Sequence, residues 1–296
     1  MWTSHGGVNR GVLYTLPAMV IIVAGLAYPV IYNFYLGLFQ GGVVGIGRQR
    51  FVGLANFAAV LRSRDFWEVA KNTILWTAGI TVVIEALGLA SALLLNQSVR
   101  GQLVFRVILL LPFVIPGIVC ALIWRFMLDP QFGALNDVLW RLRITHAYFP
   151  WLARKDTALL TVMVVYLWKV FPFPMIMFLA SLQSIPAELY EAARADGANS
   201  AQLLRLITVP MLRGTILVTT ILMVILSFNS FDLTYIMTGG GPIRASEILA
   251  MYVYDLGFTA INYNGAAAVA TLMFVVSIIF IVLYVARSSR TKRDTL

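Results

Sequence analysis

The sequence predicts an all-α, polytopic membrane protein with six transmembrane helices. The 296-residue chain is 60% hydrophobic and only 12% charged, whereas a typical soluble domain has about 25% charged residues. It also contains long segments without Asp, Glu, Lys or Arg, and a helix needs only about 20 apolar residues to cross a bilayer. These uncharged segments are Gly11–Gly47, Val107–Trp124, Gly214–Phe231 and Leu256–Ala286.

Two further blocks are nearly as apolar and complete the set of six spans. Thr73–Asn96 contains Glu85, and Ala158–Leu182 contains Lys169. We expect residues 1–296 to form one transmembrane domain. The expected spans cover residues 13–38, 73–95, 105–127, 158–182, 212–237 and 264–286. Interfacial helices are expected in the two long outer segments, 48–72 and 129–157.

The even number of spans places both termini on the same side of the membrane. The segment Arg287–Arg293 contains four positive residues, which favours the cytoplasmic side. Over the whole chain, however, Lys and Arg are divided almost equally between the two sides. The first span is longer than the core of a signal peptide, so we expect it to be retained. Both termini are therefore predicted to be cytoplasmic.

Several classes of catalytic and metal site are missing from the sequence. None of the lysines follows a glycine, so there is no Gly-Lys-Ser/Thr phosphate loop and the chain is not a P-loop ATPase. Two histidines and the single Cys120 cannot form an HExxH or CxxC site. No Gly-x-Ser-x-Gly elbow accompanies His146, the one histidine within the body of the chain. We expect no catalysis, no metal site and no cofactor bound by this chain.

A polar segment, residues 186–210, separates the fourth and fifth spans. Pro186 suits a helix start, because its missing N–H would be unpaired there in any case. Glu188 and Glu191 would then offset the positive end of the helix. Gly197 would end the helix and allow the chain to turn.

A second short helix is expected over about residues 200–208, before Pro210 stops it. It would present Leu203, Leu204 and Ile207 on one face. An ordinary amphipathic connector would also satisfy this pattern. The function of the segment therefore depends on its motif as well as its shape.

The segment resembles the "EAA" loop of binding-protein-dependent ABC importer permeases. Glu191-Ala192-Ala193 is followed by Asp196-Gly197 and then by Ile207-x-Val209-Pro210. The resemblance implies the ABC type I importer permease fold and a loop that docks onto a separate ATPase. The implied coupling residues are Glu191, Ala192, Ala193, Asp196, Gly197, Ile207 and Pro210. The chain departs from the common pattern at Leu204, Val209 and Gly214, where Phe, Leu and Pro are frequent.

Three further stretches resemble the sugar-type permeases of this family, and the first of them is an outer loop. It reads Phe51-Val52-Gly53-Leu54-x-Asn56-Phe57. The second comprises Trp168-Lys169-x-x-Pro172-Phe173 and Leu182-Gln183-Ser184-Ile185-Pro186, and the third comprises Phe231-Asp232 and Thr238-Gly239-Gly240-Gly241-Pro242. Together with the coupling loop they cover the chain from about residue 50 to its end.

The resemblance also implies the partners and the location of the chain. It implies a heterodimer with a second homologous permease, two ATPase subunits that bind ATP and Mg, and an extracytoplasmic solute-binding protein. The location would be the cytoplasmic (inner) membrane of a bacterium or archaeon, in contact with lipid and not with nucleic acid. The cargo would be a carbohydrate or a polyol or sugar phosphate. The alternatives are a permease for another solute class and an ion-coupled secondary transporter.

Three ionisable residues lie at membrane depth, where they usually face a cavity or a partner. Lys169 precedes Pro172 and Pro174, which should kink the fourth span. It would either donate to substrate or form an ion pair with Glu85 or Asp232, and the sequence does not separate these roles. Glu85 is expected to be structural.

The resemblance to the sugar-type permeases also implies where a solute would bind. On the fourth span, the candidates are Lys169, Val170 and Phe173. On the fifth span, they are Leu226, Ser227, Phe228, Asn229, Ser230 and Asp232. Phe173 and Phe228 could stack on sugar rings, although packing explains such aromatic residues equally well.

Overall fold

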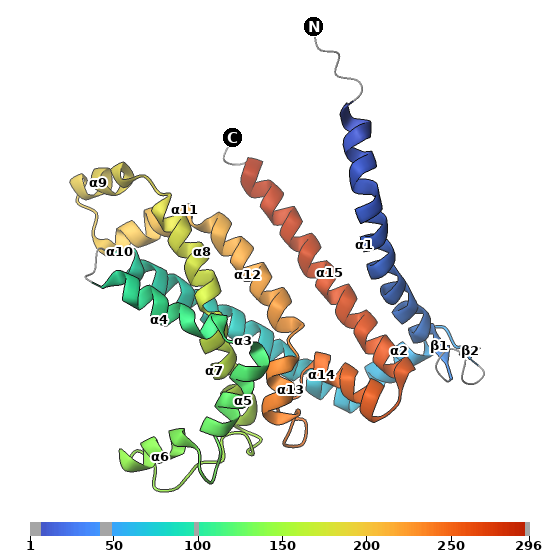
Figure 1. Ribbon diagram of the computed structural model, residues 1–296. Helices are drawn as coiled ribbons and strands as arrows, with labels where there is room; N and C mark the ends of the chain where they lie inside the picture. Colours follow the sequence, from blue (N-terminus) through green and yellow to red (C-terminus); the bar gives the residue numbers. More distant parts are fainter. Residues whose placement is uncertain (1–6, 42–48, 98–100, 294–296) are drawn as a thin grey trace. The chain divides into compact units, whose positions relative to one another are not determined.

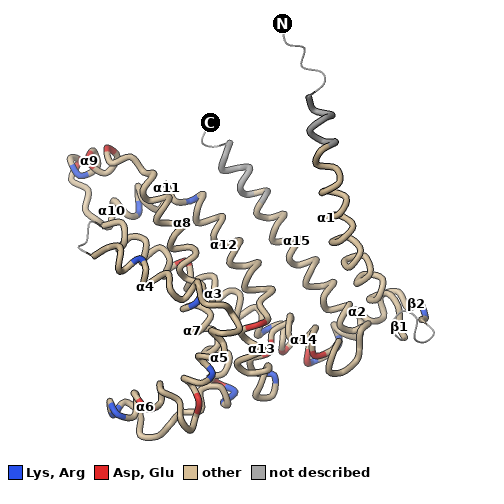
Figure 2. The backbone as a smooth tube through the Cα atoms, in the orientation of Figure 1, with Lys and Arg blue, Asp and Glu red and all other residues tan. Residues whose placement is uncertain are grey.

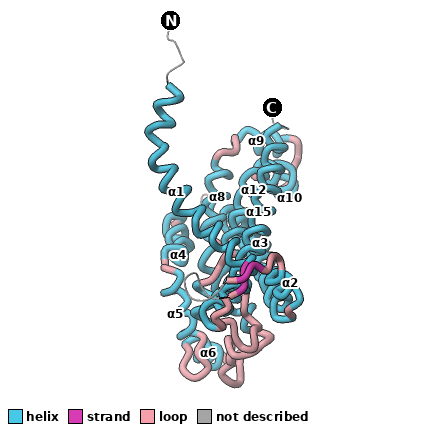
Figure 3. The backbone as a smooth tube through the Cα atoms, turned by 90° about the vertical axis from the view of Figure 1, so that its right-hand side faces the viewer, coloured by secondary structure: helices cyan, strands magenta, loops and turns pink. Residues whose placement is uncertain are grey.

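A computed structural model describes residues 7–41, 49–97 and 101–293 and confirms the all-α class. Among the described residues, strand structure is confined to a short hairpin of β1 (Phe39–Gln40) and β2 (Arg50–Phe51) (Figure 3). The chain forms two compact units. Unit 1 consists of Met1–Ser63 and Val253–Phe274, and unit 2 consists of Arg64–Tyr252 and Val275–Leu296.

Unit 1 contains α1 (Gly7–Leu38), the hairpin, α2 (Ala55–Arg62), η2 (Asp255–Thr259) and the beginning of α15 (Tyr263–Arg293). Asparagine side chains hold these elements together. Asn33 Nδ2 donates to Thr271 Oγ1 at 3.0 Å, and Asn56 Nδ2 donates to the carbonyl of Phe39 at 2.7 Å. Such bonds satisfy polar groups that would otherwise be unpaired among apolar helices.

Unit 2 is built around the long helix α3 (Arg64–Leu95). Trp76, Ile80 and Ile84 recur on successive turns of α3 and are fully buried, because residues four apart share one helix face. Trp76 packs edge-on against Tyr166 of α7 (Ala158–Val170), with ring centroids 5.2 Å apart. Nearer the C-terminal end of α3, Gly88 allows close approach of α8, since a Cβ there would lie 3.1 Å from Pro174.

The described helices include three that are long and apolar enough to cross a membrane, within α1, α3 and α15. Three bent helix pairs bring the number of candidate spans to six if each pair counts as one span, and the third pair joins Ser200–Met211 to Arg213–Phe228. Only three of the six candidate spans are therefore single helices.

The third span, predicted over 105–127, is broken in its middle and does not form one continuous helix. α4 (Gln102–Val114) and α5 (Gly117–Met127) are bent by 97°. Pro116 explains the break, because proline has no N–H and forces the residue before it out of the helical region. Ile115 is accordingly extended, with φ −66° and ψ 127°.

The fourth span is bent by 40° between α7 and α8 (Pro172–Gln183). This bend confirms the kink predicted from Pro172 and Pro174. The two prolines lie in the first turn of α8 and are buried, at helix positions where a missing N–H costs little.

The fifth span, predicted over 212–237, is also interrupted. α12 (Arg213–Phe228) ends before Asn229, and α13 (Asp232–Thr238) begins after Phe231. Asn229 Nδ2 donates to the carbonyl of Ile225 at 2.9 Å, and such side-chain bonds compete with the helix ladder.

Helices do occur in both predicted outer segments, although one boundary differs. α2 lies in 48–72, but α3 already begins at Arg64. α6 (Ala134–Arg141) lies in 129–157, where the fully buried Asn136 donates to the carbonyls of Asp129 and Phe149. This single side chain therefore connects the part of the segment before α6 with the part after it.

Candidate functional site: a coupling segment and two broken spans

The coupling segment, residues 186–212, lies at one end of unit 2 (Figure 1). Its first helix is α9, and a second helical stretch follows after residues 196–199. The elements are α9 (Ala187–Ala195), α10 (Ser200–Leu203), the π-helical turn η1 (Leu204–Thr208) and α11 (Val209–Met211).

Gly197 ends α9, as predicted. Its φ is +86°, which side chains with a Cβ rarely adopt. The amide of Ala198 donates to the carbonyl of Ala193 at 2.9 Å, and the amide of Gly197 donates to that of Arg194 at 3.0 Å. This pair of bonds is the Schellman motif, which satisfies carbonyls at the helix end.

A capping box begins the second helical stretch. Asn199 Oδ1 accepts from the amide of Gln202 at 3.0 Å, and the amide of Asn199 donates to Gln202 Oε1 at 2.8 Å. The Asn-x-x-Gln spacing is visible in the sequence. The second helix was predicted to begin at Ser200, but Asn199 was not predicted to be its N-cap.

Pro210 does not stop the second helix, contrary to the prediction. The helix continues to Met211 and bends by 68° at the junction with α12. In η1 each backbone amide bonds the carbonyl five residues earlier, instead of four as in an α-helix. The amide of Val209 accordingly donates to the carbonyl of Leu204. This widened turn precedes Pro210 and accommodates its missing N–H.

One side-chain bond and one pocket connect the two helices of the coupling segment. Tyr190 Oη lies 3.0 Å from Thr208 Oγ1, and Thr208 is buried. Beside this bond is a pocket of about 530 Å³. Its walls come from the end of α3, from α8 and from both helices of the segment, and Glu191 and Arg194 contribute to them.

The charges of α9 are exposed. Glu188, Glu191, Arg194 and Asp196 all lie on the surface, and none belongs to an ion pair within the described residues. Figure 2 shows that charged residues gather here and at the opposite end of unit 2, with few between. α9 therefore offers charged groups that the described chain does not neutralise.

The structure brings all the predicted coupling residues into this one segment. Ala192 is exposed and Ala193 is half-buried on α9. Ile207 lies in η1 and Pro210 in α11, and both are half-buried. The remaining three, Glu191, Asp196 and Gly197, are exposed.

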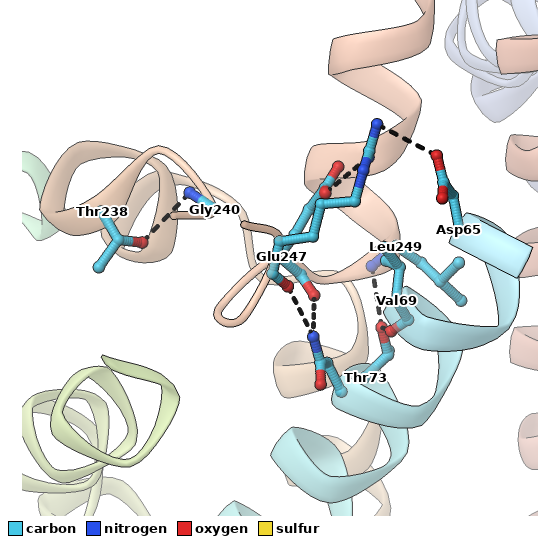
Figure 4. Close-up of polar contacts among 9 residues, drawn as sticks. Asp65, Val69, Thr73, Thr238, Gly240, Glu247 and Leu249 are labelled. Carbon is cyan, nitrogen blue, oxygen red and sulfur yellow. Dashed lines mark hydrogen bonds and ion pairs between the residues drawn. The ribbon is translucent and has the colours of Figure 1, made fainter. Parts of the chain in front are cut away.

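A second polar group, the Arg244 cluster, lies at the opposite end of unit 2. It consists of Asp65, Asn72, Thr73, Arg244, Glu247 and Leu249 (Figure 4). Arg244 Nη1 lies 2.7 Å from Glu247 Oε2, and Asn72 Nδ2 donates to the carbonyl of Arg244 at 2.9 Å. The amide of Leu249, the first residue of α14 (Leu249–Tyr254), donates to Thr73 Oγ1 at 2.9 Å.

The Arg244 cluster fixes the loop that follows α13 onto α3. Ile243 and Arg244 in this loop have φ of 47° and 60°. Positive φ is unusual for residues other than glycine and persists only where the surroundings determine it.

Lys169 has a partner that the sequence did not indicate. Its Nζ donates to the carbonyl of Ile115, at the break of the third span, at 2.6 Å. No ion pair within the described residues joins it to Glu85 or Asp232. Pro116 marks the break in the sequence, but nothing local connects that break with Lys169.

The other candidates on the fourth span lie at its bend. Val170 and Phe173 are half-buried and pack against the main apolar cluster of unit 2. The ring of Phe173 lies 6.2 Å from that of Phe113 on α4.

The candidates on the fifth span differ in accessibility. Ser227 is fully buried, and its Oγ donates to the carbonyl of Met223 at 2.6 Å. Phe228 is buried and packs edge-on against Phe280. The accessible candidates are Leu226, Asn229 and Asp232, which are exposed, and Ser230, which is half-buried.

Glu85 contacts the fifth span. Its Oε2 accepts from Thr219 Oγ1 at 2.9 Å, and Thr219 is fully buried on α12. This contact links α3 to α12 inside unit 2. In the part of the chain that the structure describes, no group of three or more His, Cys, Asp or Glu residues could hold a metal ion.

Comparison with known proteins identifies the family. Residues 85–293 match the family described as "Binding-protein-dependent transport system inner membrane component". The trehalose/maltose transport system permease protein of Thermococcus litoralis is 34% identical, over 96% of this chain and 95% of its own length. The sulfoquinovosyl glycerol transport system permease protein of Agrobacterium fabrum is 32% identical, over 98% and 94%.

The fold has a counterpart among solved structures. A chain of a bacterial ABC transporter involved in the import of the acidic polysaccharide alginate superposes with a TM-score of 0.82. The two chains are 22% identical, over 95% of this chain and 96% of the other. The ABC type I importer permease fold is therefore confirmed. The chain belongs to the family of binding-protein-dependent transport system inner membrane components, the permeases of ABC importers.

Proposed function

We propose that this chain moves a carbohydrate across the cytoplasmic membrane by alternating access, driven by ATPases that dock on α9. The observation that carries the proposal is the exposed, charged α9, held at a fixed angle by Gly197 and by the bond between Tyr190 and Thr208. Such a helix would transmit movement of the docked ATPases to the transmembrane helices. The chain itself would bind no cofactor, and ATP and Mg would bind to the ATPases.

The proposed cargo rests on relatives and on the broken spans. Two relatives more than 30% identical over nearly the whole chain are named for trehalose and maltose and for sulfoquinovosyl glycerol. Breaks in the third, fourth and fifth spans free backbone groups that can line a solute path. Val170, Phe173, Leu226, Ser230 and Asp232 would be the residues that line it, since each lies at a break and is at least partly accessible. Three further candidates are not available in this state: Ser227 and Phe228 are buried, and Asn229 bonds its own helix. They would line the solute path in another state of the transport cycle.

The proposed assembly has four further subunits. A second homologous permease would complete the solute path, two ATPases would bind at the coupling segments, and a solute-binding protein would dock on the outer side. With six spans, both termini would lie on the same side of the membrane as α9, which would be the cytoplasmic side in this assembly. The C-terminal positive cluster predicted this orientation, but its side chains lie outside the described residues.

Uptake by the co-expressed transporter in membrane vesicles tests the proposal. The vesicles would contain the chain with its cognate permease, ATPase and binding protein, and would be offered labelled disaccharides, sugar phosphates, amino acids and phosphate. We expect ATP-dependent uptake of a carbohydrate or sugar phosphate. ATP-dependent uptake of an amino acid alone would refute the cargo, and uptake by this chain without the ATPase would refute the coupling.

A further inference from the structure

The breaks of the third and fourth spans lie against each other, and Lys169 joins them. α4 ends at Val114 just before Pro116, and α7 ends at Val170 just before Pro172. Lys169 lies in the last turn of α7, and its ammonium donates to the carbonyl of Ile115 at 2.6 Å. One side chain therefore connects two bends of 97° and 40°.

Aromatic contacts flank this bond on both sides. Trp168, next to Lys169, packs edge-on against Trp124 of α5, with ring centroids 5.4 Å apart. Phe173, on the other side of the bend, lies 6.2 Å from Phe113 of α4. Each half of the third span thus contacts one half of the fourth span.

The ammonium suits this position electrostatically. The carbonyl of Ile115 lies at a helix break, and an unpaired carbonyl at membrane depth is costly. The carboxyl ends of α4 and α7 meet here, and helix carboxyl ends carry partial negative charge. A Lys side chain can donate to the carbonyl and offset both helix ends. Among the described residues, no carboxylate competes as an ion-pair partner of Lys169.

We propose that Lys169 is a positioning residue that pins the bend of the third span to the bend of the fourth. α8 leads directly from the pinned bend to the coupling segment. From the bend of the third span, α5 leads in the other direction, and its Arg125 donates to the carbonyl of Ile236 on α13 at 3.1 Å. Through α8 and α5, Lys169 thereby connects the coupling end of unit 2 with its opposite end. This role deepens the proposed transport function, but the geometry of the bend can be tested without transport.

The first experiment measures the bend in the full-length chain in lipid nanodiscs. Spin labels would be attached to Leu103→Cys on α4 and Phe126→Cys on α5, which are 73% and 65% exposed. Cys120 is only 1% exposed, and the chain without introduced cysteines serves as the blank. We expect a single narrow distance distribution in the native background and a broadened or shifted one after Lys169→Met. Lys169→Arg should retain the native distribution, because it keeps a charged donor.

A second variant disturbs the pin without changing Lys169. A Cβ on Gly117 would lie 3.8 Å from Lys169 Cε, so Gly117→Leu should displace the lysine stem. Gly117→Ala adds only that ordinary contact and is the matched control. If the Lys169→Met chain fails to insert into the membrane, the label distances in Gly117→Leu still test whether Lys169 holds the two bends together.

Uptake kinetics separate positioning from substrate contact. A charged hydrogen bond shifts an equilibrium by roughly tenfold or more. We therefore expect Lys169→Met and Gly117→Leu to lower the maximal uptake rate by about tenfold, with the half-saturating solute concentration changed less than about twofold. A raised half-saturating concentration with an unchanged distance distribution would make Lys169 a substrate contact and overturn the proposal. Unchanged values in both experiments would also overturn it.

The two proposals can fail separately. If the native transporter moves no solute, the transport proposal fails, yet the distance measurement still tests the pin. If uptake is normal in the native chain and the label distances are the same in every variant, only the pin fails.

Discussion

The coupling segment and the Arg244 cluster lie at opposite ends of unit 2 and are held in opposite ways. The bonds of the coupling segment are local, such as the cap between Asn199 and Gln202, and α9 has no buried residue. The Arg244 cluster is held by bonds between residues more than 170 positions apart, and its Glu247 is only 5% exposed. Local bonds fix a shape and leave its surface free, whereas long-range bonds make a segment part of the core. This contrast supports the proposal that α9 docks onto a partner, and it favours a structural role for the Arg244 cluster.

The largest effect is expected from Gly197→Val. No atom lies within 4 Å of a Cβ at this position, so the substitution acts only through the backbone, whose φ of +86° a β-branched residue resists. The bend after α9 should be lost, and ATP-driven uptake should be abolished while the chain still inserts into the membrane. Gly197→Asn is the matched control, because asparagine tolerates positive φ. Normal uptake by the valine variant would contradict the coupling assignment.

Asn72→Ala should reduce stability without abolishing docking. It removes two hydrogen bonds to the carbonyls of Arg244 and Glu247, both part-buried, and the loss of each costs about 0.5–1.5 kcal/mol. The thermal midpoint of the purified chain should fall. Asn229→Ala is the control, since its exposed side chain bonds only its own helix. If both variants unfold at the native temperature, the Arg244 cluster is not structural.

A smaller and more local effect is expected from Asn199→Ala. Loss of an N-cap side chain costs about 1 kcal/mol, and only the second helix of the coupling segment should lose protection against hydrogen exchange. Asn199→Ser should retain most of the cap. Loss of protection at the Arg244 cluster as well would show that the two ends are not independently held.

The smallest effect is expected from Asp156→Asn, outside both regions. The Arg154 guanidinium lowers the pKa of the Asp156 carboxyl from its ordinary value of 3.8. A lowered pKa means that any contribution to stability is complete above about pH 3.8 and is lost as the pH falls through the lower value. Both side chains are exposed, so we expect no measurable change in the thermal midpoint at neutral pH. A clear fall would mean that this surface pair matters more than solvent screening allows.

The sequence predicted helices and turns well where local chemistry determines them. The apolar blocks gave six spans, Gly197 gave the end of α9, and Pro172 gave the bend of the fourth span. Each of these depends on one residue type or on a short period. The break at Asn229 was missed, because an uncharged polar residue does not interrupt an apolar block as a charge does.

Contacts between distant segments could not be predicted in the same way. Pro116 is a visible helix breaker, but Lys169, which donates to the carbonyl of the preceding Ile115, lies 54 residues further along the chain. The two pairings proposed for Lys169 were ion pairs, because a lone carbonyl at a helix break has no signature in the sequence. The same holds for Asn72, whose partners lie 172 and 175 positions away.

Cross-linking to the cognate ATPase tests the central claim most directly. Ala192→Cys places a thiol on exposed α9, and Ile243→Cys places one at the opposite end, where the side chain is 82% exposed. A photoreactive thiol reagent on each variant, in membranes containing the ATPase, should link the chain to the ATPase from position 192 and not from position 243. Cross-linking from position 243 alone, or from neither position in a transporter that imports solute, would contradict the account.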